Sequence, residues 1–263
     1  MPAPLGVRGR YEVDGVLMEI RGKVAIVTGG GTGIGRAVSL ELARLGASVV
    51  VNYSRSEAEA GQTVADIEAL GGTALAMRAD VRSEAAARAM AAAAAKALGG
   101  IDLLVNNAGM TRYIPLADLE SVTDQIWDEI LAVNLIGAFR CVRAVVPYMT
   151  ERGGGAICSV TSVAGITGDG SSLPYAVSKA ALNGLTRSLA KALAPSIRVT
   201  AVAPGIVRTR WVAGREAHVE RLSRTALLQR TARPEDVAQM ICALLAQDAI
   251  TGQVIPVEAG LLP

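Results

Sequence analysis

The sequence predicts a single doubly wound α/β domain, with a parallel sheet of about seven strands and helices on both faces. Two observations predict it. From residue 23 onward, short runs rich in β-branched residues alternate with longer segments of helical periodicity. No repeat or linker divides this stretch, so one domain is expected over residues 21–263. Right-handed crossovers between parallel strands then place helices on both sides of the sheet.

Four strand–helix units are predicted in the first half of the chain. The first strand, "KVAIVTG", is a continuous apolar run, typical of a strand buried on both faces. Gly46 is a typical stop for the first helix. The predicted strands cover 23–29, 47–53, 73–81 and 101–109, and the helices cover 35–46, 56–70, 83–98 and about 122–150.

The second half continues the alternation, and the first 20 residues precede it. Strands are predicted at 155–162, 197–205 and 252–260, and helices at 174–194 and 234–246, with two short helices within 210–228. Residues 1–20 have no clear periodicity and are expected to form a loose N-terminal extension. Met18 could itself be a natural start.

Composition excludes several classes of protein. The net charge of +2 is too balanced to indicate nucleic acid or an anionic membrane surface as a partner. Three scattered cysteines and one histidine predict neither a disulfide framework nor a metal site. No apolar run is expected to reach membrane-spanning length, and the N-terminus lacks the apolar core of a signal peptide. We therefore expect a cytoplasmic protein.

A glycine-rich loop, "TGGGTGIGRA", joins the first strand to the first helix. A helix N-terminus offers unpaired N–H groups to a pyrophosphate, and glycines let the phosphate approach the backbone. The spacing GxGxxG does not fit, because Arg36 stands where the third glycine belongs. TGxxxGxG does fit, with Thr28, Gly29, Gly33 and Gly35. The loop indicates a dinucleotide site, and a glycine-rich turn without a ligand is the alternative.

Tyr175 and Lys179 lie four residues apart in "PYAVSKAAL" and therefore share one helix face. A free tyrosine has a pKa near 10 and is a poor base at neutral pH. A neighbouring ammonium is expected to lower that pKa, so that Tyr175 can exchange a proton with a carbonyl or alcohol. Taken alone, the pair favours a contact on a helix surface over a catalytic role.

The glycine loop, the "NNAG" at 106–109 and the Tyr-x-x-x-Lys together resemble the short-chain dehydrogenase/reductase family, in its form of about 250 residues. The resemblance runs from about Arg21 to the C-terminus, and the overall pattern is similar to 3-oxoacyl-acyl-carrier-protein reductases. It implies a Rossmann-type domain. The TGxxxGxG spacing points away from the longer members that act on nucleotide sugars.

The resemblance also implies the catalytic residues. Ser162, in "SVTSVAG", matches a serine that hydrogen-bonds the substrate oxygen, with Ser159 and Thr161 as competing candidates. Asn134, in "LAVNLIG", matches an asparagine that interrupts the long helix and carries a water-mediated proton path; the alternative is a satisfied core amide. Tyr175 exchanges the proton, and Lys179 also holds the nicotinamide ribose.

Cofactor contacts follow by the same resemblance. Asp80 and Val81 match a pair beside the adenine, and Ile206 faces the carboxamide. Asn106 is expected to stabilise the sheet instead. The expected contacts are Thr28, Gly29, Gly31, Thr32, Gly33, Ile34, Gly35, Asp80, Val81, Asn107, Ala108, Gly109, Tyr175, Lys179, Pro204, Gly205, Ile206 and Thr209.

The end of the second strand predicts which cofactor is preferred. NAD enzymes commonly place an acid there for the adenosine ribose, and here we expect that position to be the neutral Asn52, followed by Ser54 and Arg55. Arg55 can bind a 2′-phosphate, and Arg36 can add a second charge. NADP(H) is therefore predicted over NAD(H). NAD(H) stays possible, because Thr32 rather than a basic residue stands in the glycine loop.

The expected function is NADP-dependent reduction of a ketone, 3-oxoacyl or related, to a secondary alcohol by reversible hydride transfer. The alternatives are a sugar, polyol or steroid alcohol dehydrogenase on the same site, and a dinucleotide sensor without catalysis. Enoyl reductases space Tyr and Lys more widely and are disfavoured. The segment 206–233 should cover the substrate, and it carries Trp211 and seven arginines. An anionic or carrier-linked substrate is possible, although we expect most of these arginines to be solvated.

Two helices predict self-association. The helices at 122–149 and 174–194 carry more apolar positions than one buried face requires. These positions include Leu131, Phe139, Val142, Val146, Leu185 and Leu189. Since family members pair these helices, a homotetramer is expected, with a dimer as the alternative. The only other partner expected is the small carbonyl or alcohol substrate.

Overall fold

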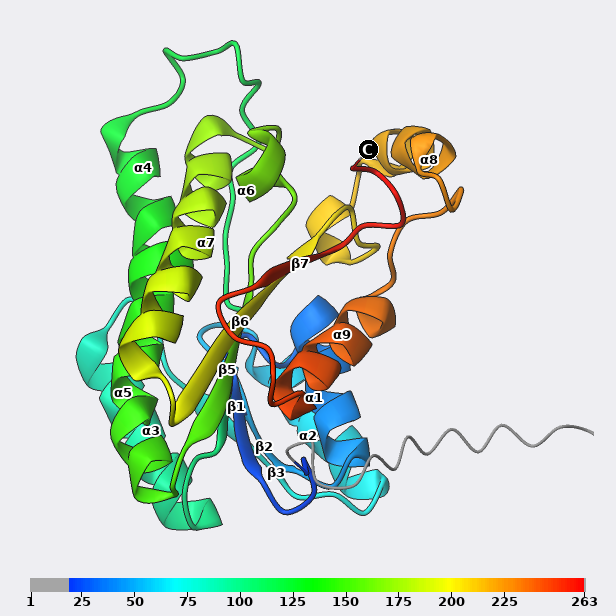
Figure 1. The fold of residues 1–263 in the computed structure, drawn as a ribbon. Coiled ribbons are helices and arrows are strands. Elements are labelled where there is room, and N and C mark those ends of the chain that lie inside the picture. Colours follow the sequence, from blue (N-terminus) through cyan, green and yellow to red (C-terminus); the bar gives the residue numbers. More distant parts are fainter. Residues whose placement is uncertain (1–18, 263) are drawn as a thin grey trace, which may run out of the picture.

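The computed structural model describes residues 19–262 and confirms one doubly wound α/β domain (Figure 1). Residues 1–18 of the expected extension lie outside the described residues. Within 19–262, seven parallel strands form one sheet in the order β3-β2-β1-β4-β5-β6-β7. The strands are β1 (Val24–Val27), β2 (Ser48–Tyr53), β3 (Ala74–Arg78), β4 (Leu103–Asn106), β5 (Gly155–Val160), β6 (Ile197–Pro204) and β7 (Val254–Val257).

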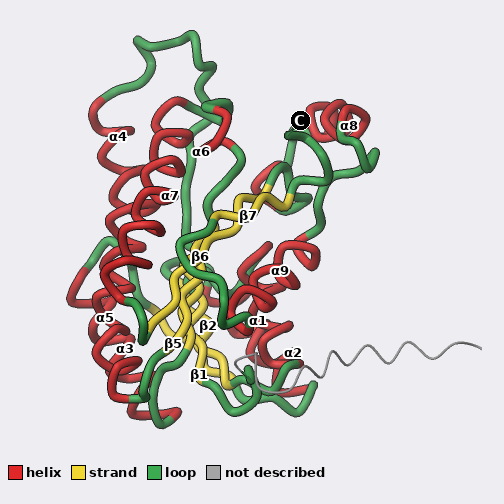
Figure 2. The backbone as a smooth tube through the Cα atoms, in the orientation of Figure 1, coloured by secondary structure: helices red, strands yellow, loops and turns green. Residues whose placement is uncertain are grey.

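Helices cover both faces of the sheet (Figures 1 and 2). One layer holds α1 (Gly33–Arg44), α2 (Glu57–Ala69) and α9 (Pro234–Ala246); the other holds α3 (Glu84–Leu98), α4 (Asp124–Leu131), α5 (Ala138–Glu151) and α7 (Leu173–Leu193). Side chains alternate along each strand, so Val27 and Val49 join the core under the first layer. Ile26 and Val50 join the core under the second. Both cores are built mainly from Ala, Val, Leu and Ile.

Several strands end earlier than predicted. The predicted strands 73–81, 101–109, 155–162 and 252–260 end at residues 78, 106, 160 and 257. At the end of β4 the backbone N–H of Asn107 turns away from the ladder and donates to Thr28 Oγ1 and Val105 O. The residues that follow each strand, including Ser162, therefore lie in loops at one edge of the sheet.

The helix predicted at 122–150 is interrupted. A π-helical turn, Ala132–Gly137, separates α4 from α5, and Asn134 lies within it. Apolar periodicity does not reveal a single extra residue in a turn, so the sequence pattern reads as continuous. A short helix, α6 (Ala164–Thr167), was not predicted, whereas η2 (Arg210–Val212) and α8 (Glu216–Thr225) confirm two short helices within 210–228.

Together, Asp124–Glu151 form 28 helical residues that are long and apolar enough to cross a membrane, with a mean hydropathy of 1.6 in the most apolar window. The expectation that no segment reaches this length is therefore wrong. In the fold, however, this helix packs against the sheet, and Cys141, Val145 and Met149 are fully buried in the core. A core helix of an α/β domain meets the same criteria of length and composition.

The strand order reverses between β1 and β4. The chain builds outward from β1 through β2 and β3, then returns to pair β4 with β1. Open α/β sheets bind their ligands at the carboxyl ends of the strands, beside such a reversal. In this protein that edge carries the residues singled out from the sequence.

Candidate active site

A cleft of about 1400 Å³ runs along the carboxyl ends of the strands. It is lined by the glycine loop, the loops after β2 to β6, and the segment that carries η2 and α8. Ser162, Tyr175 and Lys179 lie in its wall. Every residue predicted to contact the cofactor lines the cleft, except Thr28 and Gly35.

The glycine loop leaves the N-terminus of α1 open to an anion. Thr32 is the N-cap, but its side chain makes no capping hydrogen bond, and the first turn holds no acidic residue. Gly33 has φ +54°, and a Cβ on it would lie 3.3 Å from Thr209 Cγ2. The loop and Thr209 thus enclose a narrow space beside free helix N–H groups, which fits the pyrophosphate of a dinucleotide.

Thr28 and Gly35 hold the loop in place rather than line the cleft, which corrects their predicted contact with the cofactor. The hydroxyl of Thr28 accepts hydrogen bonds from the N–H groups of Asn107 at 2.9 Å and Ala108 at 3.0 Å. A Cβ on Gly35 would lie 2.2 Å from the carbonyl oxygen of Gly29. Helix α1 can approach the loop this closely only because residue 35 has no side chain.

Asn52 lines the cleft, but its side chain is occupied by the backbone. Its Oδ1 accepts from Gly29 N at 3.3 Å, and its Nδ2 donates to the carbonyls of Tyr53, Met77 and Ala79. The amide is 2% exposed and joins β2, β3 and the glycine loop. The expectation that it faces the adenosine ribose as a neutral substitute for an acid is therefore not supported.

Arg36 does not supply the second positive charge that was expected. Its guanidinium lies 2.6 Å from a carboxylate oxygen of Asp66 on α2, and it does not line the cleft. Arg55, in contrast, does line it. Arg55 makes no ion pair within residues 19–262, and its charge helps to keep the pKa of Asp80 low, after the larger effect of the hydrogen bonds from Arg82.

A second arginine without an ion pair to the described residues at this end of the cleft is Arg78, which the sequence analysis missed. It ends β3 and stands in register with Tyr53 at the end of β2. Arg78 lines the cleft and makes no ion pair with the carboxylates of the described residues. The strand pattern contained the signal, because a basic residue at the carboxyl end of a strand beside β2 falls at this edge.

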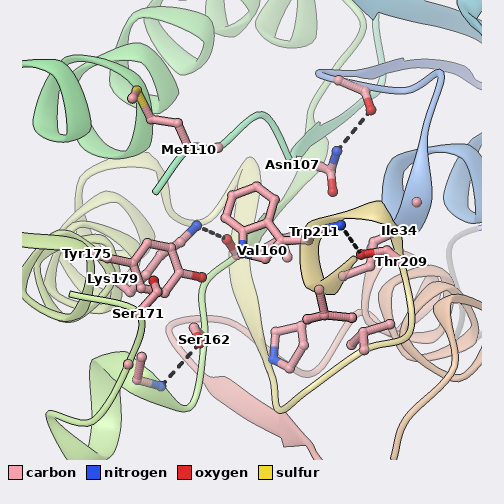
Figure 3. Close-up of a pocket in the computed structure, with 18 of the residues that line it drawn as sticks. Ile34, Asn107, Met110, Val160, Ser162, Ser171, Tyr175, Lys179, Thr209 and Trp211 are labelled. Carbon is pink, nitrogen blue, oxygen red and sulfur yellow. Dashed lines mark hydrogen bonds between the residues drawn. The ribbon is translucent and has the colours of Figure 1, made fainter. Parts of the chain in front are cut away.

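Helix α7 brings Tyr175 and Lys179 to the middle of the cleft, beside Ser162 (Figure 3). Lys179 is 4% exposed, and its Nζ donates to the carbonyl of Val160 at 2.8 Å and lies 5.7 Å from the Tyr175 ring centroid. Ser162 Oγ accepts the N–H of Ala164 at 3.1 Å, at the start of α6. The unpredicted helix α6 thus fixes the serine hydroxyl.

The pKa values of the pair differ from the sequence-based expectation. Burial raises the pKa of Tyr175 to about 12, and the adjacent hydroxyl of Ser162 opposes this only partly. Burial also lowers the pKa of Lys179 to about 8. For the protein chain alone the pKa of Tyr175 is thus raised rather than lowered, and desolvation of the phenolate is the main cause.

Asn134 braces the site from the π-helical turn. Its Oδ1 accepts from Met110 N at 2.8 Å, and its Nδ2 donates to Met110 O and to Ser178 Oγ, both at 3.0 Å. Ser178 Oγ in turn donates to the carbonyl of Tyr175 at 2.7 Å. The side chain of Asn134 is thus a satisfied core amide that connects Met110 to the helix of Tyr175. Ser178 was not singled out from the sequence.

The segment that carries η2 closes over the reacting groups. The rings of Trp211 and Tyr175 are 6.2 Å apart between centroids (Figure 3). The hydroxyl of Tyr113 donates to the carbonyl of Trp211 at 2.9 Å, which joins the loop after β4 to this segment. Both Trp211 and Tyr113 are about two-fifths exposed, at 41% and 42%. Tyr113 lies in a loop without periodicity, so no sequence pattern pointed to it.

This fold, with a phosphate-binding loop and a buried Tyr–Lys pair in one cleft, defines a dinucleotide-dependent oxidoreductase. Comparison with known proteins specifies the family. Residues 23–220 match the short chain dehydrogenase family. The chain belongs to this family and is an NAD(P)-dependent enzyme that acts on CH–OH or C=O groups.

Relatives with names and solved structures agree. The chain is 42% identical to the granaticin polyketide synthase putative ketoacyl reductase 2 of Streptomyces violaceoruber, over 90% of this chain and 95% of the relative. It is 37% identical to the 3-oxoacyl-[acyl-carrier-protein] reductase FabG of Thermotoga maritima, over 93% and 100%. A short chain dehydrogenase from Burkholderia cenocepacia J2315, solved in complex with NADP, matches with a TM-score of 0.85 and 33% identity over 93% and 99%.

Proposed function

We propose that the protein reduces a ketone, of the 3-oxoacyl type or closely related, to a secondary alcohol with NADP(H). The observation that carries the proposal is the meeting of Ser162, Tyr175 and Lys179 at the middle of a cleft whose other end fits a dinucleotide. A sensor would require the dinucleotide end alone. The names of the ketoacyl reductase and FabG relatives support the choice of substrate class.

The reacting groups divide the work as follows. Bound NADPH supplies the hydride. Ser162, held by the N–H of Ala164, donates a hydrogen bond to the substrate oxygen and stabilises the charge that develops there. Tyr175 gives its phenolic proton to the same oxygen. Lys179, fixed on Val160 O, places a positive charge beside the phenol as that proton leaves.

Asn134 acts in this proposal as a positioning residue. Both N–H donors of its side chain are taken by Met110 and Ser178, so the amide has no proton to pass to water. A water-mediated proton path would therefore run along the backbone of the π-helical turn, where the regular helix bonding is interrupted. Asn134 keeps that turn and the helix of Tyr175 in register.

The pKa values of Tyr175 and Lys179 predict how the rate of ketone reduction depends on pH. With a pKa of about 12, Tyr175 holds its proton at neutral pH, which suits the donor role in reduction. With a pKa of about 8, Lys179 loses its charge as the pH rises past that value. The kcat/KM for ketone reduction should therefore be level near neutral pH and fall above about pH 8. A stopped-time assay from pH 6 to 10 checks this, and a rise above pH 8 would contradict it.

The replacement Tyr175→Phe tests the proposed function. Removing the proton donor should lower kcat for ketone reduction by about 10²- to 10⁴-fold. The Kd for NADPH should stay within about twofold, because the dinucleotide end is untouched. The substrates are a panel of β-ketoesters, acyl thioesters, sugars and steroids, assayed with each cofactor. Unchanged turnover would exclude the mechanism, and failure of the wild type on every ketone would favour the sensor.

Self-association through α4–α5 and α7 remains a proposal. Ile136, Phe139 and Val177 are 37–45% exposed on these helices and would be covered by a second copy. Val142 does not belong to this face, contrary to expectation, because it is 2% exposed and packs in the core. A homotetramer should appear by light scattering at micromolar concentration, and a monomeric mass would exclude it.

A further inference from the structure

Among the seven arginines of residues 206–233, five are paired with carboxylates. The paired arginines are Arg208, Arg210, Arg224, Arg230 and Arg233. The remaining two, Arg215 and Arg221, make no ion pair with any carboxylate of residues 19–262. Both line the cleft. Unpaired cations therefore gather where a substrate would enter, whereas most arginines of this segment are neutralised by protein groups.

Helix α8 separates its charges by face. His218 and Arg221 lie three residues apart, and Arg215 is the N-cap a further three residues back, so the three follow one side of the helix. All three line the cleft. Glu220 and Arg224 pair with each other at 3.2 Å and do not line it. The cleft side of the helix is thus cationic without compensation.

The groups on the cleft side are close together and keep free donors. Arg221 lies 3.0 Å from His218 Nδ1, and the pKa of His218 is lowered by burial and then by the charges of Arg221 and Arg215. The guanidinium of Arg215 lies 3.4 Å from the centroid of the Tyr113 ring. Stacking uses the flat face of a guanidinium and leaves its in-plane N–H groups available for an anion.

The acidic side chains of the cleft do not neutralise this cluster. Glu129 is paired with Arg112 at 2.9 Å, and Asp80 with Arg82 at 2.7 Å. Asp169 also lines the cleft, in the loop before α7, and is paired with neither Arg215 nor Arg221. The cluster connects to the reacting end through the hydrogen bond from the Tyr113 hydroxyl to the Trp211 carbonyl and the ring contact of Trp211 with Tyr175.

We propose that Arg215 and Arg221 form an anion-binding subsite for the substrate, which holds a carboxylate or phosphate group carried by the ketone. This inference rests on the proposed function, since it concerns the far end of the molecule that Tyr175 reduces. The substrate is then a ketone with an anionic end and an apolar middle that passes Trp211. Arg215 and Arg221 determine its selection and take no part in the chemical step.

Matched ketones test the subsite and distinguish the two anions. 4-Oxopentanoate and its methyl ester share a carbon skeleton and differ by a carboxylate. Acetoacetyl-4′-phosphopantetheine and acetoacetyl-pantetheine share a thioester and differ by a phosphate. The wild type should favour the anionic member of at least one pair, and the pair identifies the anion. In Arg215→Gln, Arg221→Gln and the double variant, KM for that member should rise roughly ten- to a hundredfold, the range of a lost charge-assisted contact.

The controls make every outcome decisive. The kcat for the anionic ketone, kcat/KM for the neutral one and the Kd for NADPH should change less than about twofold, a margin well below the cost of a charged hydrogen bond. Arg224→Gln, on the outer face of α8, should behave like the wild type. The subsite is excluded if the wild type does not prefer the anionic ketone of either pair. It is also excluded if KM in the arginine variants rises equally for both members of a pair, or if Arg224→Gln raises KM for the anionic ketone as much as they do.

A separate readout keeps the inference apart from the proposed function. Calorimetric titration of the NADP⁺-bound protein with the same four compounds measures binding without turnover, because the oxidised cofactor has no hydride to give. If no ketone is reduced but an anionic compound binds more tightly than its neutral partner and loses this preference in the double variant, the proposed function fails and the subsite stands. If ketones are reduced without any such preference, the reverse holds.

Discussion

The two ends of the cleft are built in different ways. At the dinucleotide end, buried side chains tie the loops to the strand ends: Thr28 binds Asn107 and Ala108, and Asn52 binds the glycine loop and β3. At the substrate end, the segment with η2 and α8 is held by contacts between partly exposed side chains, such as Tyr113 with Trp211.

This difference separates what the fold requires from what the substrate requires. Changes at the dinucleotide end alter packing in the sheet, so they should affect stability and cofactor binding together. Changes in the covering segment touch few buried groups and should affect substrate affinity alone. Each of the following predictions tests whether the two ends can be changed independently.

The largest effect is expected for Gly35→Ala at the dinucleotide end. The new Cβ would lie 2.2 Å from Gly29 O and 2.5 Å from Asn107 Nδ2, so α1 must move away from the loop. We expect the free energy of unfolding to fall by about 3 kcal/mol, the upper part of the range for overpacking. Affinity for NADPH should fall with it. Denaturant unfolding and fluorescence titration with NADPH measure the two.

Gly184→Ala in α7 is the matched control, because a Cβ there would meet nothing within 4 Å. An alanine in a helix interior should raise stability by about 0.5–1 kcal/mol. Equal losses in the two variants would mean that Gly35 is not needed for close packing.

Asn52→Asp should be the next most damaging change. A carboxylate keeps the acceptor for Gly29 N, but it cannot donate to the carbonyls of Tyr53, Met77 and Ala79. Those carbonyls would then lack a donor and face a buried negative charge, at a cost of about 2–3 kcal/mol. Thermal unfolding should show the loss. Ser54→Asp, at an exposed position just after β2, is the control and should unfold like the wild type.

The sequence predicted the dinucleotide end of the cleft better than the substrate end. Strand–helix alternation predicted the fold, because it depends on core patterns in contiguous residues. The glycine loop indicated the dinucleotide site, and the family resemblance implied most of the other residues that line it. The direction of a side chain at a strand end depends on neighbouring strands, and this is why Asn52 and Arg78 were misjudged. The π-helical turn at Asn134 confirmed the expected interruption of the long helix. The hydrogen bonds that run from Asn134 through Ser178 to the carbonyl of Tyr175 join two helices, and no sequence pattern predicts them.

The substrate end was less predictable for a physical reason. Tyr113 and Trp211 meet across 98 positions of the sequence. Tyr113 lies in a loop, and Trp211 lies in the three-residue helix η2, which is too short for a periodic pattern to fix the direction of its side chain. Likewise, the sequence shows seven arginines in 206–233, but it does not show that Arg215 and Arg221 are the two without a carboxylate partner in residues 19–262. That distinction depends on which face of α8 turns to the cleft, and on carboxylates such as Glu59 and Asp236 that come from elsewhere.

A smaller effect is expected at the boundary of the dinucleotide end, where Arg55 and Arg78 are free to bind a 2′-phosphate. The double replacement by alanine should lower kcat/KM with NADPH roughly ten- to a hundredfold, as for a lost charged hydrogen bond. The value with NADH should change little, because NADH lacks that phosphate. Steady-state kinetics with both cofactors measure the ratio. Arg36→Ala is the control, since Arg36 pairs with Asp66 outside the cleft. Higher efficiency of the wild type with NADH would refute the predicted preference.

The smallest effect is expected for Trp211→Ala at the substrate end. The indole faces the Tyr175 ring at 6.2 Å and is 41% exposed, so its loss removes one aromatic wall without opening the core. The bond from Tyr113 goes to the Trp211 carbonyl and survives the change. An aromatic contact of this kind is worth about 0.5–1.5 kcal/mol, which predicts a rise in the KM for the ketone of roughly two- to tenfold. The melting temperature and the Kd for NADPH should not move. Leu228→Ala, in the same segment but outside the cleft lining and 62% exposed, should leave KM unchanged. If Trp211→Ala instead lowers the melting temperature or weakens NADPH binding as much as ketone binding, the two ends of the cleft are coupled, and the covering segment is part of the dinucleotide site.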